Sequence, residues 1–293
     1  MPLILPESLP AAKALQDENI FVMRPERARA QDIRPLEILV ANLMPNKIIT
    51  EIQLARVLAN SPLQVRFTLL RTGSHQSAHT PSEHMEAFYT TIDEVKKRRF
   101  DGMIITGAPV ERLEYEQVDY WDELLDIIAY AKENVYSVIY LCWAAMAVLY
   151  HNYGIQKSML ESKLHGVFPH RVQRPSNPLM RGIDEVFWVP HSRHAEVRRE
   201  DIAKIPELRI LADSEEAGLH ILGTENGREI YIFGHMEYDK NTLWEEYRRD
   251  VNAGMTPPLP RHYFYSGDPE KGVDFRWRGS GHLLYSNWLN YYV

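Results

Sequence analysis

The sequence has 293 residues, of which 45% are hydrophobic and 25% are charged, a composition typical of a globular protein. Its net charge of -7 and the lack of a long basic run give nucleic-acid binding little support. No apolar stretch approaches the roughly 20 residues that cross a bilayer, and the first residues lack the pattern of a signal peptide. A single cysteine excludes an internal disulfide, and these features together predict a cytoplasmic protein.

The first half of the chain alternates between apolar strands and amphipathic helices. Strands are predicted at residues 36–43, 63–70, 102–107 and 135–141, and helices at residues 48–58, 83–97 and 116–133. This alternation predicts an α/β fold with a mostly parallel open sheet and helices on both faces. Met44, Gly107 and Cys142 each follow a predicted strand, so they should converge at the crevice beyond the carboxyl ends of the strands.

The second half of the chain is less regular. Strands are predicted at residues 185–190, 208–212, 219–222 and 229–233, and a helix at residues 241–251. The aromatic tail at residues 283–293 should pack on the core. Because no internal repeat or clear linker is present, we expect one domain over residues 1–293, with residues 1–34 as an N-terminal extension packed on it.

Cys142 is the candidate nucleophile. It lies where a predicted strand turns into an apolar helix that begins at Trp143. A side chain at such a corner is pushed out of the sheet, beside helix N-terminal N–H groups that favour a thiolate and can bind an oxyanion. The alternative is a buried apolar filler, because free cysteine is among the most buried residue types.

A nucleophilic thiol needs a base, and the base needs a group that orients it. His235 follows a predicted strand and a glycine, and Glu237 lies two positions further on. In extended backbone such positions face the same side, so the Glu237 carboxylate can fix the imidazole tautomer. The alternative is a loop histidine beside an unrelated surface glutamate.

Other histidines compete for this role. His191 and His194 flank Ser192 and Arg193 after another predicted strand, and Arg193 can bind a substrate carboxylate through its forked guanidinium.

Neither a metal nor a nucleotide cofactor has a clear signal. His75, His79 and His84 lie close together in the sequence, but their spacing matches no strong zinc pattern, and one cysteine excludes a cysteine-based structural site. We therefore expect no metal. The chain has no P-loop and no Gly-x-Gly-x-x-Gly motif, so it lacks a local signal for a nucleotide triphosphate or a dinucleotide.

Several segments carry a resemblance to a known family. They are residues 19–28, 31–35, 42–47, 100–111, 118–121, 190–194, 214–218 and 286–291. Through these segments the chain resembles, nearly end to end, the homoserine O-acyltransferases of the MetA type. Cys142 at a strand-to-helix corner, with His235 and Glu237 far along the chain, is similar to the arrangement of the class I glutamine amidotransferase-like fold.

The resemblance implies a ping-pong acyl transfer in methionine biosynthesis. Cys142 would take the acetyl group of acetyl-CoA, and His235 would then deprotonate the homoserine hydroxyl that attacks the acyl-cysteine. Glu237 would orient His235, and the backbone N–H of Trp143 would bind the oxyanion because it follows the nucleophile. The resemblance also implies a homodimer, with acetyl-CoA as a co-substrate and no bound cofactor.

The resemblance also implies substrate contacts. Lys163, Ser192 and Arg249 match positions that hold the amino-acid substrate, and an arginine fork suits its α-carboxylate. Glu111 matches the position associated with acyl choice, where glycine goes with succinyl-CoA and glutamate with acetyl-CoA. Glu111 would fill the space of a succinyl chain and repel its carboxylate, so we expect acetyl-CoA. Lys47 is a further candidate for contact with CoA or the acyl group, or else a surface or loop lysine.

The chain departs from the family pattern just after the nucleophile. Met146 and Val148 stand where family members commonly have a glutamine and a glycine, which leaves serine open as acceptor. Succinyl-CoA stays open as donor, because acetyl-CoA is expected from a single residue. Two other classes also stay open: a glutaminase or thiol hydrolase with the same corner, and a catalytically silent binding protein.

Overall fold

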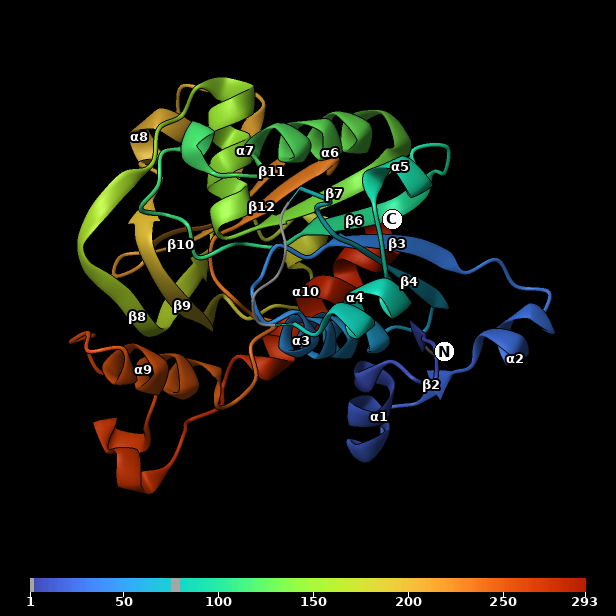
Figure 1. The fold of residues 1–293 in the computed structure, drawn as a ribbon. Helices are drawn as coiled ribbons and strands as arrows, with labels where there is room; N and C mark the ends of the chain where they lie inside the picture. The colour runs from blue at the N-terminus through green and yellow to red at the C-terminus, as the bar shows by residue number, and fades with distance from the viewer. Residues whose placement is uncertain (1–2, 75–79) are drawn as a thin grey trace.

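The computed structural model describes residues 3–74 and 80–293. Within these residues the strands form one twelve-stranded sheet that runs through the centre of the molecule (Figure 1). The strands are β1 (Leu3–Ile4), β2 (Val22–Met23), β3 (Leu36–Ala41), β4 (Val65–Leu70), β5 (Tyr89–Thr90), β6 (Phe100–Ile105), β7 (Val135–Leu141), β8 (Ser158–Val172), β9 (Val186–Glu196), β10 (Leu208–Ser214), β11 (Gly218–Thr224) and β12 (Glu229–Ile232).

The sheet has a parallel half and an antiparallel half. Its order is β2-β1-β4-β3-β6-β7-β12-β11-β10-β8-β9, with β5 paired to β4. Every pairing from β2 to β12 is parallel, and so is that of β4 with β5, whereas every pairing from β12 to β9 is antiparallel. β12 therefore borders both halves, and its carboxyl end lies beside that of β7 because the two strands run in the same direction.

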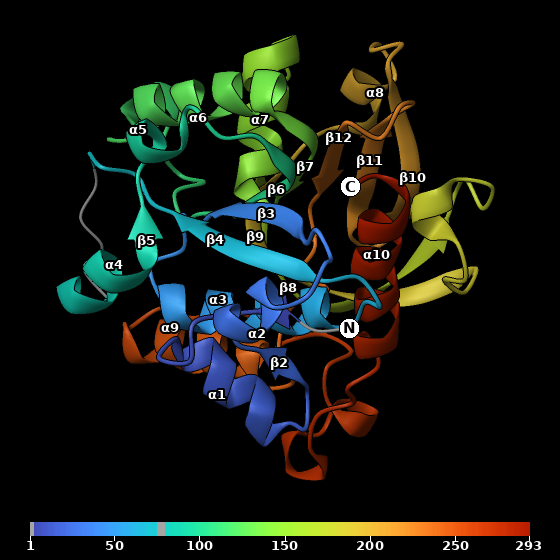
Figure 2. The same ribbon diagram turned by 90° about the vertical axis from the view of Figure 1, so that its right-hand side faces the viewer.

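Helices cover both faces of the sheet. They are α1 (Pro10–Asp17), α2 (Pro25–Arg29), α3 (Lys47–Ala59), α4 (Ser82–Phe88), α5 (Ile92–Val95), α6 (Trp121–Asn134), α7 (Trp143–Tyr153), α8 (Arg199–Ile202), α9 (Thr242–Asn252) and α10 (Arg278–Tyr291). Figures 1 and 2 show α6 and α7 above the sheet and α1 and α3 below it, and α10 packs in the same core as α3. The mostly parallel α/β sheet covered on both faces is confirmed.

Successive side chains of the central strands point to opposite faces of the sheet. In β3, Leu39 points into the core under α6 and α7, while Ile38 and Val40 point into the core over α3 and α10. Because both faces are buried, these strands are continuous apolar runs, which is the pattern that the sequence displays. The aromatic tail forms α10, where Trp288 is fully buried and donates from Nε1 to Ser137 Oγ at 3.0 Å.

Three segments differ from the expectation. The helix predicted at residues 83–97 is wrong, because Tyr89 and Thr90 pair with β4 as β5, and Thr91 then caps a new helix, α5. The fifteen residues of β8 had no predicted strand, and two short strands, β1 and β2, lie in the N-terminal segment that showed none. None of the helices in the described ranges combines the length and apolarity that a bilayer crossing requires.

Candidate active site

Cys142 occupies a sharp corner between β7 and α7. Its backbone has φ 49° and ψ -111°, a conformation that costs a non-glycine residue about 1–3 kcal/mol. The surrounding sheet holds the corner in place, because the Cys142 N–H donates to Ile232 O at 2.7 Å. Gly107 packs against it so closely that an added Cβ would lie 3.1 Å from the Cβ of Cys142. The predicted convergence of these two positions is therefore present.

His235 and Glu237 follow the neighbouring strand β12. Nδ1 of His235 lies 2.7 Å from Oε1 of Glu237, and the Cys142 side chain is close enough to the imidazole to stabilise its cationic form. With Nδ1 engaged by the carboxylate, Nε2 is the nitrogen left for the thiol. The predicted pairing is thus present, but its predicted reason is wrong: the backbone of residues 236–237 is a turn, not an extended segment.

The surroundings of His235 favour its cationic form. Burial lowers the pKa of this imidazole, but the charge of Glu237 and the contact with Cys142 outweigh burial and raise the pKa well above its ordinary value. Because His235 is only 5% exposed, solvent screens these interactions weakly. The site therefore places a cationic imidazole beside the Cys142 sulfur.

Sequence reasoning missed Tyr238. Its ring stacks on the His235 imidazole with centroids 4.2 Å apart and planes 14° apart. The phenol of Tyr238 donates to Glu246 at 3.0 Å, and its backbone carbonyl accepts from Trp277 Nε1 at 2.8 Å. An anchored ring on the face of the imidazole limits its rotation. The only sequence signal was an aromatic residue three positions after the candidate base.

A cavity of about 420 Å³ opens over this corner. Its lining includes Met44, Gly107, Glu111, Cys142, Lys163, Ser192, His194, His235, Tyr238, Glu246, Arg249 and Asp250. The structure thus brings together the candidate nucleophile, base, acyl-selecting residue and substrate contacts. Burial raises the pKa of Glu111 above its ordinary value.

Asp250 links two of the expected substrate contacts and was also missed. It accepts from Lys163 Nζ at 2.7 Å, and from Nε and an Nη of Arg249 at 3.0 and 2.7 Å. Burial would raise the pKa of Asp250, but the two cations hold it below its ordinary value. Asp250 is 4% exposed, so the two cations are oriented by a buried carboxylate.

Some expected residues lie away from the cavity. Arg193 is 1% exposed and donates to Ala195 O and Ala217 O, so the expectation that it binds a substrate carboxylate is wrong. Lys47 is not a loop lysine either: it is buried, donates to Asn42 O at 2.6 Å and does not line the cavity. Burial lowers its pKa to about 8.

The two departures from the family pattern are core residues. Met146 and Val148 are fully buried on α7 and pack among the residues under α6. Neither lines the cavity, so neither side chain forms a wall of the acceptor site. Trp143 begins α7, where a backbone N–H lacks an intrahelical acceptor, and its side chain is fully buried.

Of the histidines considered for a metal, His75 and His79 lie outside the described residues. His84 is buried, and its Nε2 lies 2.9 Å from Glu51 Oε1.

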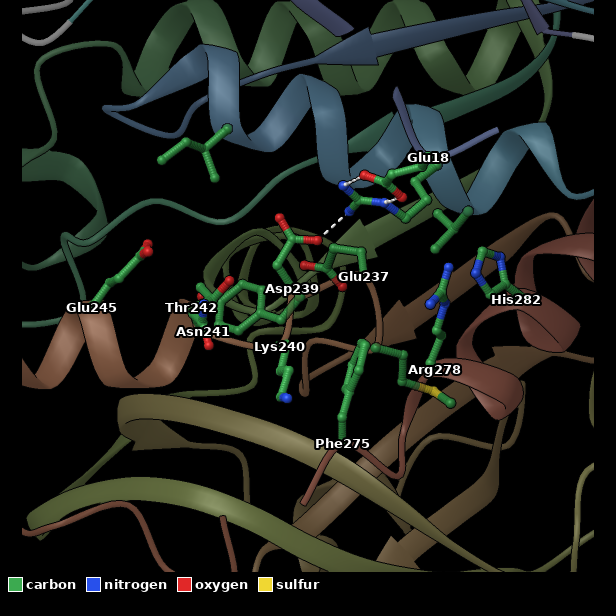
Figure 3. Close-up of a pocket in the computed structure, with 15 residues that line it drawn as sticks. Glu18, Glu237, Asp239, Lys240, Asn241, Thr242, Glu245, Phe275, Arg278 and His282 are labelled. Atoms are coloured by element: carbon green, nitrogen blue, oxygen red, sulfur yellow. Dashed lines mark hydrogen bonds and ion pairs between the residues drawn. The ribbon is translucent and has the colours of Figure 1, made fainter. Parts of the chain in front are cut away.

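A neighbouring cavity of about 470 Å³ also touches Glu237 and Tyr238. In Figure 3, Glu237, Asp239 and Lys240 reach it from the segment after β12, and Arg278 and His282 from α10. Cys142 does not line it. The cavity that contains the thiol is therefore the better candidate for the reaction.

Comparisons with solved structures identify the fold. A glutamine amidotransferase from Thermotoga maritima superposes with a TM-score of 0.57 at 12% identity, covering 88% of this chain and 97% of that chain. One from Methylobacillus flagellatus gives 0.54 at 14% identity, covering 89% and 96%. At such identities the likeness concerns the fold alone, which is class I glutamine amidotransferase-like, as expected.

Comparisons of sequence identify the family. The homoserine O-acetyltransferase of Acetivibrio thermocellus is 54% identical to this chain, covering 100% of it and 96% of the relative. The homoserine O-acetyltransferases of Bacteroides fragilis and Methanomethylophilus alvi are each 53% identical over 100% of this chain, and over 96% and 95% of their own lengths. A family model described as homoserine O-succinyltransferase matches residues 2–293. The chain therefore belongs to the homoserine O-succinyltransferase family.

Proposed function

We propose that this protein transfers the acetyl group of acetyl-CoA to the hydroxyl of L-homoserine through an acetyl-cysteine at Cys142. The observation that carries the proposal is that Cys142 and His235 line the same cavity, with Nδ1 of His235 held 2.7 Å from Oε1 of Glu237. Relatives named homoserine O-acetyltransferase across the whole chain supply the substrates.

In the first half-reaction the Cys142 thiolate attacks the thioester carbon of acetyl-CoA. The oxyanion that develops is placed to accept from the backbone N–H of Trp143 at the start of α7. The bond to the CoA sulfur then breaks, and the His235 imidazolium donates its Nε2 proton to that sulfur. A thioester replaces a thioester, so this step is nearly balanced in energy.

In the second half-reaction the neutral His235 accepts the hydroxyl proton of homoserine through Nε2. The hydroxyl oxygen attacks the acetyl carbon, and the Cys142 thiolate leaves, which restores the starting ion pair. Glu237 keeps the proton on Nδ1 throughout and stabilises the imidazolium each time it forms. Conversion of a thioester to an oxygen ester runs downhill, which drives the transfer.

Homoserine carries a carboxylate and an ammonium group, and the cavity offers a partner for each. Arg249 and Lys163, fixed by Asp250, suit the α-carboxylate. Glu246 suits the α-ammonium, because its Oε2 is buried without a hydrogen-bond partner while its Oε1 accepts from Tyr238. This pairing predicts selectivity for a free amino acid.

Glu111 supports acetyl-CoA over succinyl-CoA. It forms part of the cavity wall that also contains Cys142, and it is 9% exposed. A succinyl chain on the sulfur would bring a second carboxylate toward this side chain, in a site with little water to screen the repulsion.

The proposal is tested by a donor-by-acceptor matrix of initial rates. Acetyl-CoA and succinyl-CoA are each combined with homoserine and serine, and product is identified by mass spectrometry. We expect acetyl-CoA with homoserine to be the fastest pair. Release of ammonia from glutamine without CoA, together with no acyl transfer in any of the four pairs, would replace the proposal with a hydrolase.

A further inference from the structure

Three histidines lie together directly behind the turn that carries His235. His170 on β8, His191 on β9 and His220 on β11 are all at most 1% exposed. One ring nitrogen of each lies within 4.8 Å of those of the other two. The rings of His170 and His191 are nearly parallel, with planes 12° apart and centroids 4.9 Å apart, and His220 meets His170 edge to face at 4.8 Å. Among the described residues this is the group with the spacing of a metal site.

The hydrogen bonds of His191 and His170 form a chain in which every donor points the same way, from Arg193 toward Phe168. At one end Arg193 Nε, which can only donate, faces His191 Nδ1 at 3.5 Å. At the other end the carbonyl of Phe168, which can only accept, lies 2.9 Å from His170 Nδ1. Between them, Nε2 of His191 lies 3.1 Å from Nε2 of His170. Both ends require the same assignment: His191 carries its proton on Nε2, and His170 carries its proton on Nδ1.

His220 has an equally definite assignment. The backbone N–H of Gly234 donates to its Nδ1 at 3.3 Å, so the proton of the neutral ring is on Nε2, which faces the sulfur of Met236 at 3.4 Å. All three rings are therefore satisfied as neutral imidazoles. Burial agrees with this state, because it lowers the pKa of His170 to about 3 and the pKa of His191 and His220 well below their ordinary value.

These partners are the wrong kind for metal ligands. A histidine that binds a metal through one nitrogen donates its other N–H to a carboxylate, a carbonyl or water. Here the second nitrogens of His191 and His220 face donors, namely Arg193 Nε and the Gly234 N–H. If Nε2 bound a metal, donor would face donor at both places, and two buried hydrogen bonds would be lost.

The group contacts the catalytic turn at several points. Beyond the Gly234 N–H and the Met236 sulfur, an added Cβ on Gly234 would lie 2.7 Å from His191 Nε2. The next backbone N–H, that of His235, donates to Pro190 O at 2.8 Å, one residue before His191. The backbone N–H of Gly234 is thus held by His220, and the backbone N–H of His235 is held by β9, the strand that carries His191.

We propose that His170, His191 and His220 form a neutral positioning array that holds the Gly234–Met236 turn and thereby aims His235 at Cys142. The proposal rests on the proposed function only in giving His235 the role of base. Neutrality is part of the role. Arg193 and the His235 imidazolium are the cations next to the array, and a second imidazolium there would repel the one that pairs with the Cys142 thiolate.

The unmodified protein provides the first test, without any substrate. Protein labelled with ¹⁵N-histidine is studied by NMR at neutral pH, with assignment by single His→Gln replacements. We expect neutral rings with the proton on Nδ1 for His170 and on Nε2 for His191 and His220. Metal analysis of the same sample should give far less than one equivalent. One equivalent of a transition metal, or a charged ring among the three, would overturn the proposal.

Variants of His220 provide the second test. In H220N the amide oxygen can replace Nδ1 as acceptor for Gly234, whereas H220L removes the acceptor. The readout is the rate of Cys142 alkylation by iodoacetamide as a function of pH, together with kcat and KM. We expect H220L to lower kcat by roughly 100-fold, with KM nearly unchanged and a shifted alkylation profile. H220N should recover most of both properties.

The control is H165N, which changes another buried histidine of β8. The ring of His165 bonds Pro258 O through Nδ1 at 3.3 Å, an interaction that the asparagine amide can replace, and it makes no bond to the array. Its alkylation profile should match that of the unmodified protein. The same profile in H220L, with H220L folded by circular dichroism, would show that the array does not aim His235. Because alkylation needs neither CoA nor homoserine, this result stands even if the substrates are different.

Discussion

The parallel and antiparallel halves of the sheet contribute different parts of the candidate site. In the parallel half, β7 ends at the corner that carries Cys142, and the neighbouring strand β12 ends shortly before the turn that carries His235. The antiparallel half supplies Lys163 from β8 and Ser192 from β9, with Asp250 and Arg249 on α9 facing them. The reacting groups thus follow short strands that the local sequence pattern predicts well. The substrate contacts on β8 and β9 lie on long strands, and Lys163 bonds a side chain far away in the sequence.

We expect the reacting groups and the substrate contacts to affect different kinetic properties. The carboxyl ends of the adjacent parallel strands β7 and β12 place the thiol and the imidazole side by side, and the histidine array then aims His235. The substrate end depends on specific long-range bonds, such as that of Lys163 to Asp250, 87 residues apart. Changes in the reacting groups should therefore abolish turnover, and changes in the substrate contacts should alter which substrate is used and how tightly.

The largest effect is expected at Cys142. Cys142→Ser removes the thiolate while keeping the size of the side chain, and should lower kcat by at least about 10⁴-fold. Release of CoA, followed with a thiol reagent, gives the rate, and thermal unfolding checks that the fold is intact. Turnover within tenfold of the unmodified protein would mean that another group carries the acyl chain.

Glu237→Gln tests the orienting group of the parallel half. Loss of the carboxylate should lower kcat by roughly 10²- to 10⁴-fold. The direction in which the pH profile of Cys142 alkylation should shift is also defined. A negative neighbour stabilises the imidazolium, so its removal lowers the pKa of His235, and the imidazolium is lost at a lower pH than in the unmodified protein. The alkylation profile of Cys142 measures this shift, and a shift to higher pH contradicts the assignment.

Glu111→Gly tests donor choice. Removal of the side chain opens the cavity wall and removes a carboxylate, so the ratio of kcat/KM for succinyl-CoA to that for acetyl-CoA should rise by at least about tenfold. Glu114→Gly, an exposed position on the same loop, is the control. An unchanged ratio in Glu111→Gly would remove Glu111 from the account of specificity.

Asp250→Asn tests the substrate end. The carboxylate makes charge-assisted bonds worth about 1.5–3 kcal/mol to Lys163 and Arg249, so KM for homoserine should rise by roughly tenfold or more while Cys142 acylation is unchanged. Glu245→Gln, on the same helix but outside this cavity, should leave KM unchanged. Loss of acylation in Asp250→Asn would show that the two halves are not separable.

The smallest effect is on stability alone. A Cβ at Gly102 in β6 would lie 2.7 Å from the Trp288 ring, so Gly102→Ala should lower the free energy of unfolding by about 1–3 kcal/mol. Gly279→Ala, at an open position of α10, meets nothing within 4 Å and should be neutral or stabilising. Urea denaturation measures both. Equal stability of the two variants would contradict the packing of α10 on β6.

The two halves also differ in how far the sequence predicts them. In the parallel half, strands buried on both faces are apolar runs, and the corners at Cys142 and His235 follow from where those runs end. In β8 the first seven residues, 158–164, are exposed or half-buried, so no apolar alternation marks a strand. The helix predicted at residues 83–97 failed because pairing with β4, a non-local contact, outweighs local helix propensity.

Side-chain orientation and tertiary contacts explain the site residues that were missed or misplaced. Tyr238 acts through the stacking of its ring on His235, and Asp250 through its bonds to the adjacent Arg249 and to Lys163, 87 residues away. No sequence motif marks either relation. Arg193 has the residue type and position expected of a substrate contact, yet its guanidinium is directed to two backbone carbonyls in the core. Orientation within a strand depends on register, which local pattern leaves open where both faces are buried.

The central claim is that Cys142 receives an acetyl group from CoA and passes it to homoserine with the help of His235. A single-turnover chase tests it most directly: the protein is acetylated with labelled acetyl-CoA, freed of CoA by rapid gel filtration, and mixed with homoserine. The account predicts label on Cys142 before mixing and on O-acetylhomoserine after it, with serine much less effective. Absence of label from Cys142, or a label that homoserine cannot remove, would contradict it.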